Sequence, residues 1–259
     1  MRRREQGLVL FRKTRQVGSR LQKSCDQSSA LARIALALLV FHLMLKPSFG
    51  QSDLSKPLRI VAFGTSLTAR GGWQPSLKEA LGKCLKRSVI VDSVAKSGET
   101  TQWALSQTDR VADLNPDIIL IEFYANDAAL NRLIPLSSSR KSFGEVLDRL
   151  RNRRPGARII DMAMNPVFGL RSAIRPFVGS YIEAHRQEAV TRGLEFVDYR
   201  RDWERLGAAA LSKAIPDGLH PLPEIAAKII TPALVRQIAG AAALDCEVTR
   251  KSGGDVIPP

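Results

Sequence analysis

The sequence predicts an α/β fold in which helices cover both faces of a parallel β-sheet. From Leu58 onward, short runs rich in β-branched residues alternate with longer segments of helical period. Several of the short runs are apolar at consecutive positions, which is the pattern of strands buried on both faces. Strands that alternate with helices in this way are joined by right-handed crossovers, so we expect a three-layer α/β/α sandwich.

Five short runs are the strand candidates, and together they would form a five-stranded parallel sheet. They are, in chain order, 58–63 (LRIVAF), 89–94 (VIVDSV), 117–123 (DIILIEF), 158–162 (RIIDM) and 195–198 (EFVD). The helix candidates lie between and after them, at 73–86, 101–114, 141–152, 175–191 and 223–239. Pro116 and Gly156 mark turns into strands, and Gly193 lies where a helix should stop.

These elements fit one domain, at 51–244, followed by an irregular tail at 245–259. The whole chain has 259 residues, of which 44% are apolar and 25% charged. That composition excludes disordered, collagen-like and disulfide-scaffold proteins. We expect the protein to be a monomer.

The net charge of +14 suggests a nucleic-acid partner at first, but most of the excess lies in one terminal segment. Residues 1–50 contain ten basic and two acidic residues, a local charge of +8, which leaves +6 for the rest of the chain. Aromatic residues make up 6% of the chain and are not interleaved with the basic ones. The sequence therefore argues against nucleic-acid binding.

Residues 1–50 resemble a leader for export. A basic stretch precedes the apolar run Ile34–Leu45, and the small residues Ser48 and Gly50 follow, which fits a signal peptide cut before Gln51. The run is short for a membrane span, which needs about 20 apolar residues. An uncleaved signal anchor and a buried helix are the alternatives. We expect a periplasmic or secreted protein that meets a membrane only through this segment, if it is uncleaved.

Two cysteines follow the leader, Cys84 and Cys246. They can form one disulfide or remain two free buried thiols, and the sequence leaves both interpretations open. An oxidising compartment would favour the disulfide. The sequence contains no CxxC or HExxH motif, and only His185 and His220 lie beyond the leader. We therefore expect neither a metal site nor a cofactor.

Polar residues follow the predicted strands at the edge where open parallel sheets bind ligands. Residues 64–68 (GTSLT) follow the first strand, 95–100 (AKSGET) the second and 124–127 (YAND) the third. Residues 217–221 (DGLHP) precede the last helix. The four loops would converge at one edge of the sheet and hold the parts of an acyl-transfer site.

The residue types in these loops fit nucleophilic catalysis by serine. Ser66 needs a base to take its proton, and His220 can be that base if Asp217, three residues earlier, orients its ring. The backbone N–H groups of Ser66 and Gly98 and the amide of Asn126 can donate to an oxyanion. An α/β-hydrolase is disfavoured, because its G-x-S-x-G motif is absent.

Taken together, GTSLT, AKSGET, YAND and DGLHP resemble the four sequence blocks of the SGNH/GDSL hydrolases, over about 58–234. The resemblance implies a flavodoxin-like fold, a catalytic set of Ser66, His220 and Asp217, and an oxyanion hole of Ser66, Gly98 and Asn126. Two positions depart from the family. Thr65 replaces the usual Asp, and Tyr124 replaces the usual Gly, which puts the substrate in doubt but touches no proton-transfer group.

Each site residue also has a purely structural interpretation. Ser66 can cap a helix, Gly98 can serve a turn, Asn126 an Asx turn and Asp217 a capping loop. Three further groups are predicted to be structural or solvent-exposed: Glu122 and Asp127 as partners of loop backbone, His185 as a surface residue, and the basic run 149–158 as a solvated helix face and turn.

The sequence thus predicts an exported serine esterase that hydrolyses O-acyl esters, O-acetyl included, of small molecules or carbohydrates. A lysophospholipase or acyl thioesterase of the same family is the first alternative. A non-catalytic carbohydrate-binding module is the second, and its expected sign is the loss of a catalytic group.

Overall fold

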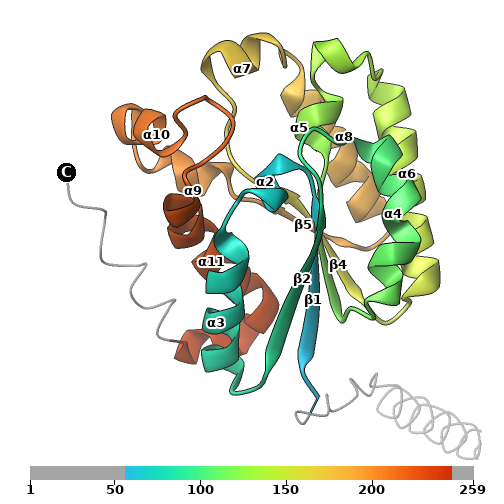
Figure 1. The fold of residues 1–259 in the computed structure, drawn as a ribbon, viewed down its shortest axis with the longest axis vertical. Helices are drawn as coiled ribbons and strands as arrows, with labels where there is room; N and C mark the ends of the chain where they lie inside the picture. Colours follow the sequence, from blue (N-terminus) through green and yellow to red (C-terminus); the bar gives the residue numbers. More distant parts are fainter. Residues whose placement is uncertain (1–55, 247–259) are drawn as a thin grey trace, which may run out of the picture. The chain divides into compact units, whose positions relative to one another are not determined.

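The computed structural model describes residues 56–246, and its centre is one sheet of five parallel strands (Figure 1). The strands are β1 (Leu58–Gly64), β2 (Val89–Ala95), β3 (Ile118–Glu122), β4 (Arg158–Ala163) and β5 (Glu195–Asp198). Their order is β2-β1-β3-β4-β5, and every neighbouring pair is parallel. This is the flavodoxin-like order, in which the direction of winding reverses between β1 and β3. The predicted sheet is confirmed.

Helices cover both faces of the sheet, as predicted. The helices α3 (Trp73–Leu85) and α11 (Pro223–Ala239) lie on one face; the other carries α4 (Thr101–Asp113), α6 (Leu136–Arg153) and α8 (Val178–Thr191). Strand β1 shows why both faces need a cover, because its successive side chains from Ile60 to Phe63 are apolar and point to opposite faces of the sheet. Ile60 and Ala62 belong to the cluster under α3 and α11, whereas Val61 and Phe63 belong to the cluster under α4 and α6.

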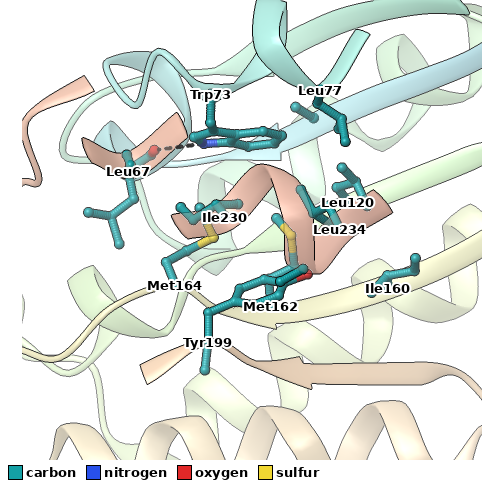
Figure 2. Packing of buried hydrophobic residues seen from close by; sticks show 14 of the residues in the cluster. Leu67, Trp73, Leu77, Leu120, Ile160, Met162, Met164, Tyr199, Ile230 and Leu234 are labelled. Atoms are coloured by element: carbon teal, nitrogen blue, oxygen red, sulfur yellow. Dashed lines mark hydrogen bonds between the residues drawn. The ribbon is translucent and has the colours of Figure 1, made fainter. Parts of the chain in front are cut away.

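The cluster under α3 and α11 also reaches toward the end of β1 (Figure 2). The ring of Trp73 is fully buried, and its Nε1–H donates to the carbonyl of Leu67 at 3.4 Å. By length and composition, residues 223–243 could cross a membrane, but Ile230 and Leu234 on this stretch are buried in the cluster. We therefore interpret α11 as a core helix.

Short helices lie in the connections. They are α2 (Ser66–Ala69), α5 (Tyr124–Asp127), η1 (Leu130–Arg132), α7 (Gly169–Ala173), α9 (Arg200–Glu204), α10 (Ala208–Ala214) and η2 (Gly240–Asp245). Two predicted helix starts are wrong. Helix α6 begins five residues before Lys141, because Pro135 caps it and its serine-rich first turns are helical. Helix α8 begins three residues after Arg175. Arg175 precedes Pro176, and a residue before a proline disfavours the helical conformation.

The described residues 56–246 lie within one compact unit, and both hydrophobic clusters are built from them, so this part of the chain has a core of its own. Within it the sulfurs of Cys84 and Cys246 are bonded, with their Cα atoms 5.0 Å apart. The predicted leader at 1–50 lies outside the described residues, and so does the predicted tail at 245–259 apart from Asp245, which ends η2, and Cys246.

Candidate active site

The predicted nucleophile and base meet at the carboxyl edge of the sheet. Ser66 begins α2, one residue beyond the end of β1, and its Oγ lies 2.8 Å from Nε2 of His220, which comes from the loop before α11. Thr65 caps α2, since its Oγ1 accepts the backbone N–H of Leu67 at 3.4 Å. The structure therefore gives the capping role to Thr65 and leaves the Ser66 hydroxyl facing the imidazole.

Asp217 holds the other side of the imidazole. Its Oδ2 lies 2.7 Å from His220 Nδ1, and its Oδ1 accepts the backbone N–H groups of His220 at 2.7 Å and Leu219 at 3.0 Å. Burial raises the pKa of Asp217, but these hydrogen bonds outweigh it and hold the pKa well below its usual value. An ionised carboxylate at this position fixes the tautomer of the ring and stabilises its protonated form.

Two residues that the sequence analysis missed support this loop. Arg171 on α7 places Nη2 3.0 Å from Asp217 Oδ2, the oxygen that also faces His220. Asn165, two residues after the end of β4, donates its amide N–H to the carbonyl of Leu219 at 2.9 Å. The signal for Asn165 was its place, because it follows a strand at the same edge as the other loops.

Glu122, at the end of β3, holds the loop that carries the nucleophile. Its Oε1 accepts the backbone N–H of Thr65 at 2.6 Å and the hydroxyl of Thr68 at 2.8 Å, and its Oε2 accepts the hydroxyl of Thr65 at 2.9 Å. The carboxyl is fully buried. Burial, only partly offset by these hydrogen bonds, raises the pKa of Glu122 to about 7. The structural role predicted for Glu122 is confirmed.

The two other oxyanion candidates are Gly98 and Asn126, and a hydrogen bond joins the segments that carry them. Gly98, after β2, has φ +83°, and a Cβ there would lie 3.0 Å from Nη2 of Arg132. The buried amide of Asn126, on α5 after β3, donates to the carbonyl of Glu99 at 2.9 Å. Only glycine adopts the conformation of residue 98 without strain, so this position favours glycine on backbone grounds.

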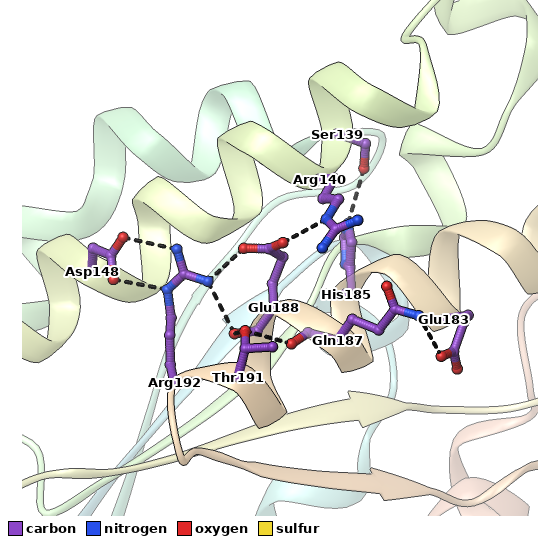
Figure 3. A network of polar contacts seen from close by, with 9 residues as sticks. All are labelled: Ser139, Arg140, Asp148, Glu183, His185, Gln187, Glu188, Thr191 and Arg192. Atoms are coloured by element: carbon purple, nitrogen blue, oxygen red, sulfur yellow. Dashed lines mark hydrogen bonds and ion pairs between the residues drawn. The ribbon is translucent and has the colours of Figure 1, made fainter.

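A buried polar network stands behind Asn126. Asp127 accepts the backbone N–H of Thr101 at 3.0 Å and its hydroxyl at 2.6 Å, which joins α5 to the start of α4. The hydroxyl of Ser139 donates to Asp127 at 2.6 Å and lies 2.9 Å from Nε2 of His185 (Figure 3). Burial raises the pKa of Asp127 despite these hydrogen bonds. The predicted structural role of Asp127 is confirmed.

The prediction that His185 is a surface residue is wrong. The side chain is 1% exposed and stacks on Phe143, with ring centroids 3.9 Å apart. Burial lowers the pKa of His185 to about 3, so the ring is neutral. Tyr181, His185 and Ala189 are all buried at a spacing of four residues, and this helical periodicity was the signal for an inward-facing histidine.

The basic run at 149–158 is engaged with carboxylates, in agreement with its predicted role as a helix face and turn. Arg153 pairs with Asp109 and Asp113, each at 2.8 Å, and Arg158 pairs with Glu195 at 2.8 Å. Within residues 56–246 no group of three or more His, Cys, Asp or Glu side chains is placed to hold a metal ion.

Comparison with known proteins agrees with this geometry. The model of the GDSL-like lipase/acylhydrolase family matches residues 62–228. A GDSL esterase/lipase of Arabidopsis thaliana is 29% identical over 126 residues, which are 42% of this chain and 51% of that protein. The chain thus spans about half the length of that relative.

The fold is similar to those of two solved structures. The lipase/acylhydrolase from Enterococcus faecalis has a TM-score of 0.58 and 21% identity, covering 70% of this chain and 95% of its own. Axe2, an acetylxylan esterase from Geobacillus stearothermophilus, has a TM-score of 0.62 and 17% identity, covering 73% and 98%. At these identities the likeness shows the fold alone. Because the family model spans more than half of the chain, from β1 through the loop of Asp217 and His220, the chain belongs to the GDSL-like lipase/acylhydrolase family.

Proposed function

We propose that the protein is a serine esterase in which Ser66, His220 and Asp217 form the catalytic triad. The observation that carries this proposal is the unbroken chain of contacts from Ser66 Oγ to His220 Nε2, at 2.8 Å, and from His220 Nδ1 to Asp217 Oδ2, at 2.7 Å. His220 takes the proton of Ser66 as the hydroxyl attacks the ester carbonyl, and returns it to the leaving alcohol. Water, activated by the same imidazole, then cleaves the acyl-enzyme.

The negative charge that develops on the carbonyl oxygen needs fixed donors in place before reaction. In this proposal they are the backbone N–H groups of Ser66 and Gly98 and the amide of Asn126. The hydrogen bond from Asn126 to Glu99 supports the arrangement, because it joins the third block to the loop of the second. The chemistry requires no metal or cofactor.

For the substrate, we propose O-acyl esters, O-acetyl included, carried by a carbohydrate. The similarity of the fold to an acetylxylan esterase supports this class. The leader predicted at 1–50 supports it too, since an exported enzyme meets extracellular glycans. Export is tested by N-terminal sequencing of the protein recovered from outside the cytoplasm. The mature chain should begin at Gln51.

A lysophospholipase or acyl thioesterase is the second candidate, and one observation favours it. Leu133 and Leu170, in segments beside the site, are 87% and 81% exposed, which suits an apolar substrate. The binding-module hypothesis loses support, because its expected sign was a missing catalytic group and all three groups are present.

The decisive experiment is hydrolysis of p-nitrophenyl esters, from acetyl to palmitoyl, by residues 51–259. Ser66→Ala and His220→Ala should each abolish turnover, whereas Ser106→Ala, an exposed serine on α4, should leave it unchanged. A short-chain optimum supports the carbohydrate acyl esterase and a long-chain optimum the lipid enzyme. Near-normal turnover by Ser66→Ala would refute the mechanism.

A further inference from the structure

Large apolar side chains are exposed mainly in the segments that flank the candidate active site. Within residues 56–246, seven large apolar residues are exposed, and only Val190 lies elsewhere. We call the other six the apolar rim: Leu130, Leu133, Leu136, Leu170, Phe177 and Leu222. Single exposed apolar residues are normal, but a group of them beside one site marks an interaction surface.

Hydrogen bonds place the two main segments of the rim beside each other and beside the site. The N–H of Leu130 donates to the carbonyl of Ile174 at 2.9 Å, so η1 adjoins the residue after α7. The guanidinium of Arg175 then donates to the carbonyl of Ala125, on α5, at 2.6 Å. In Figure 1, α5, α7 and α2 lie at the same end of the sheet. The main segments of the rim therefore lie at the same end of the sheet as the site.

Leu133 is the residue that local structure explains least. Its φ of +53° is left-handed, a conformation that favours glycine or asparagine, and its side chain is 87% exposed. Neither the backbone conformation nor packing in the core therefore explains a leucine at this position. Strained residues of this kind gather at functional surfaces.

The charge of the same segments has one sign. Residues 128–144 and 162–182 contain five basic residues and no Asp or Glu. Arg140 pairs with Glu188, Arg171 pairs with Asp217 and Arg175 is buried, so the exposed positive charge comes from Arg132 and Lys141. No carboxylate within residues 56–246 forms an ion pair with Arg132, whereas Arg153, at the opposite edge of the sheet, pairs with both Asp109 and Asp113. The rim is thus apolar and basic together, which is the combination that binds the interface of an anionic membrane.

We propose that the apolar rim docks the protein on an anionic phospholipid surface, with the active site facing the lipid. Leu133 and Leu170 enter the boundary between headgroups and acyl chains, and Arg132 contacts the headgroup phosphates. An acidic polysaccharide would use the arginines but leave the leucines in water. A second copy of the chain would bring one basic rim against another, which like charges oppose. The proposal concerns where the enzyme works and does not depend on which ester it cleaves.

The test is binding of residues 51–259 to sedimented vesicles, with the Ser66→Ala variant measured in parallel so that the result is independent of catalysis. We expect binding to vesicles of phosphatidylglycerol and phosphatidylcholine, and much weaker binding to phosphatidylcholine alone. Leu133→Asp should lower the partition coefficient about tenfold or more, and Arg132→Gln about fivefold with a weaker dependence on salt. Val190→Asp is the matched control, because Val190 lies near the other end of α8, about 18 Å along that helix from Val178. It should leave binding unchanged.

Three results would overturn the proposal. The first is no binding to anionic vesicles by chains whose circular dichroism shows them folded. The second is an equal effect of Leu133→Asp and Val190→Asp on vesicle binding, because the apolar rim would then contribute no more than the control position. The third is that Leu133→Asp or Arg132→Gln leaves vesicle binding unchanged but weakens another interaction. That interaction would be either a concentration-dependent dimer or binding to polygalacturonate. Because Leu133 is almost fully exposed, its substitution does not threaten the fold.

Discussion

Replacement of Glu122 by glutamine should make the protein more stable at alkaline pH and leave its stability at acidic pH nearly unchanged. Glutamine has the shape of a protonated carboxyl, and its oxygen can still accept the N–H of Thr65 that Glu122 Oε1 accepts at 2.6 Å. The change removes the ionisation and, like protonation of the carboxyl, puts a donor beside the Thr65 hydroxyl, which lies 2.9 Å from Glu122 Oε2 and would then accept. The variant therefore isolates the cost of a buried negative charge.

The magnitude follows from the pKa. Burial raises the pKa of Glu122 from 4.5 to about 7. Below pH 4.5 the carboxyl is protonated in both the folded and the unfolded chain and contributes nothing. Between pH 4.5 and 7 the unfolded chain loses the proton first, so the free energy of unfolding falls as pH rises. Above pH 7 the full cost is present, about 3 kcal/mol at 1.36 kcal/mol per pKa unit.

Asp161 increases this difference. It is buried on β4 beside β3, and the pKa of its carboxyl is raised well above the usual value by burial and by the charge of Glu122. Removing the charge at residue 122 therefore relieves a second carboxyl as well. Both effects act in the same direction.

The assay is urea unfolding of wild type and Glu122→Gln at pH 4, 5.5, 7 and 8. The variant's stability minus that of wild type should rise by about 3 kcal/mol across this range. Glu204→Gln, an exposed carboxylate on α9, is the control and should show no such rise. A difference that is independent of pH, or that falls as pH rises, would refute the reasoning.

Three further predictions concern the site and the disulfide. Asn126→Ala should lower kcat about 10²-fold with little change in KM, because it removes an oxyanion donor; steady-state kinetics test this, and a change confined to KM argues against the role. Asp217→Asn should impair kcat less than His220→Ala, because the acid orients the base without accepting its proton; equal losses would contradict this order. Mass spectrometry of the non-reduced protein should find Cys84 joined to Cys246, and reduction should lower the free energy of unfolding by about 2–5 kcal/mol. Two free thiols in that sample would exclude the pair.

The strands and the site loops followed from the sequence because strong local signals mark them. Each of the five strands lies within one residue of its predicted bounds at both ends, since consecutive apolar residues leave little choice of structure. Ser66 and His220 lie 154 residues apart, yet the rule that parallel strands end at one edge brings them together.

What the sequence could not predict depends on tertiary contacts. The periodicity of α8 marks His185 as inward-facing, but its packing on Phe143 and its contact with Ser139 could not be predicted, because these residues are distant in the chain. Arg171 reaches Asp217 only because α7 folds beside the loop of Asp217 and His220. Neither residue carries a local mark of its partner. The start of α6 was missed because its serines resemble a loop, although Ser139 is a buried helix residue.

The contact between Thr65 and Glu122 also constrains how this protein can evolve. Aspartate, the residue expected at position 65 from the family resemblance, would place a second carboxylate against Glu122, whose oxygens lie within 3.2 Å of the Thr65 hydroxyl. Any side chain at position 64 would meet the same group, because a Cβ there would lie 2.2 Å from Glu122 Oε1. Thr65→Asp should therefore be tolerated only when residue 122 has lost its charge.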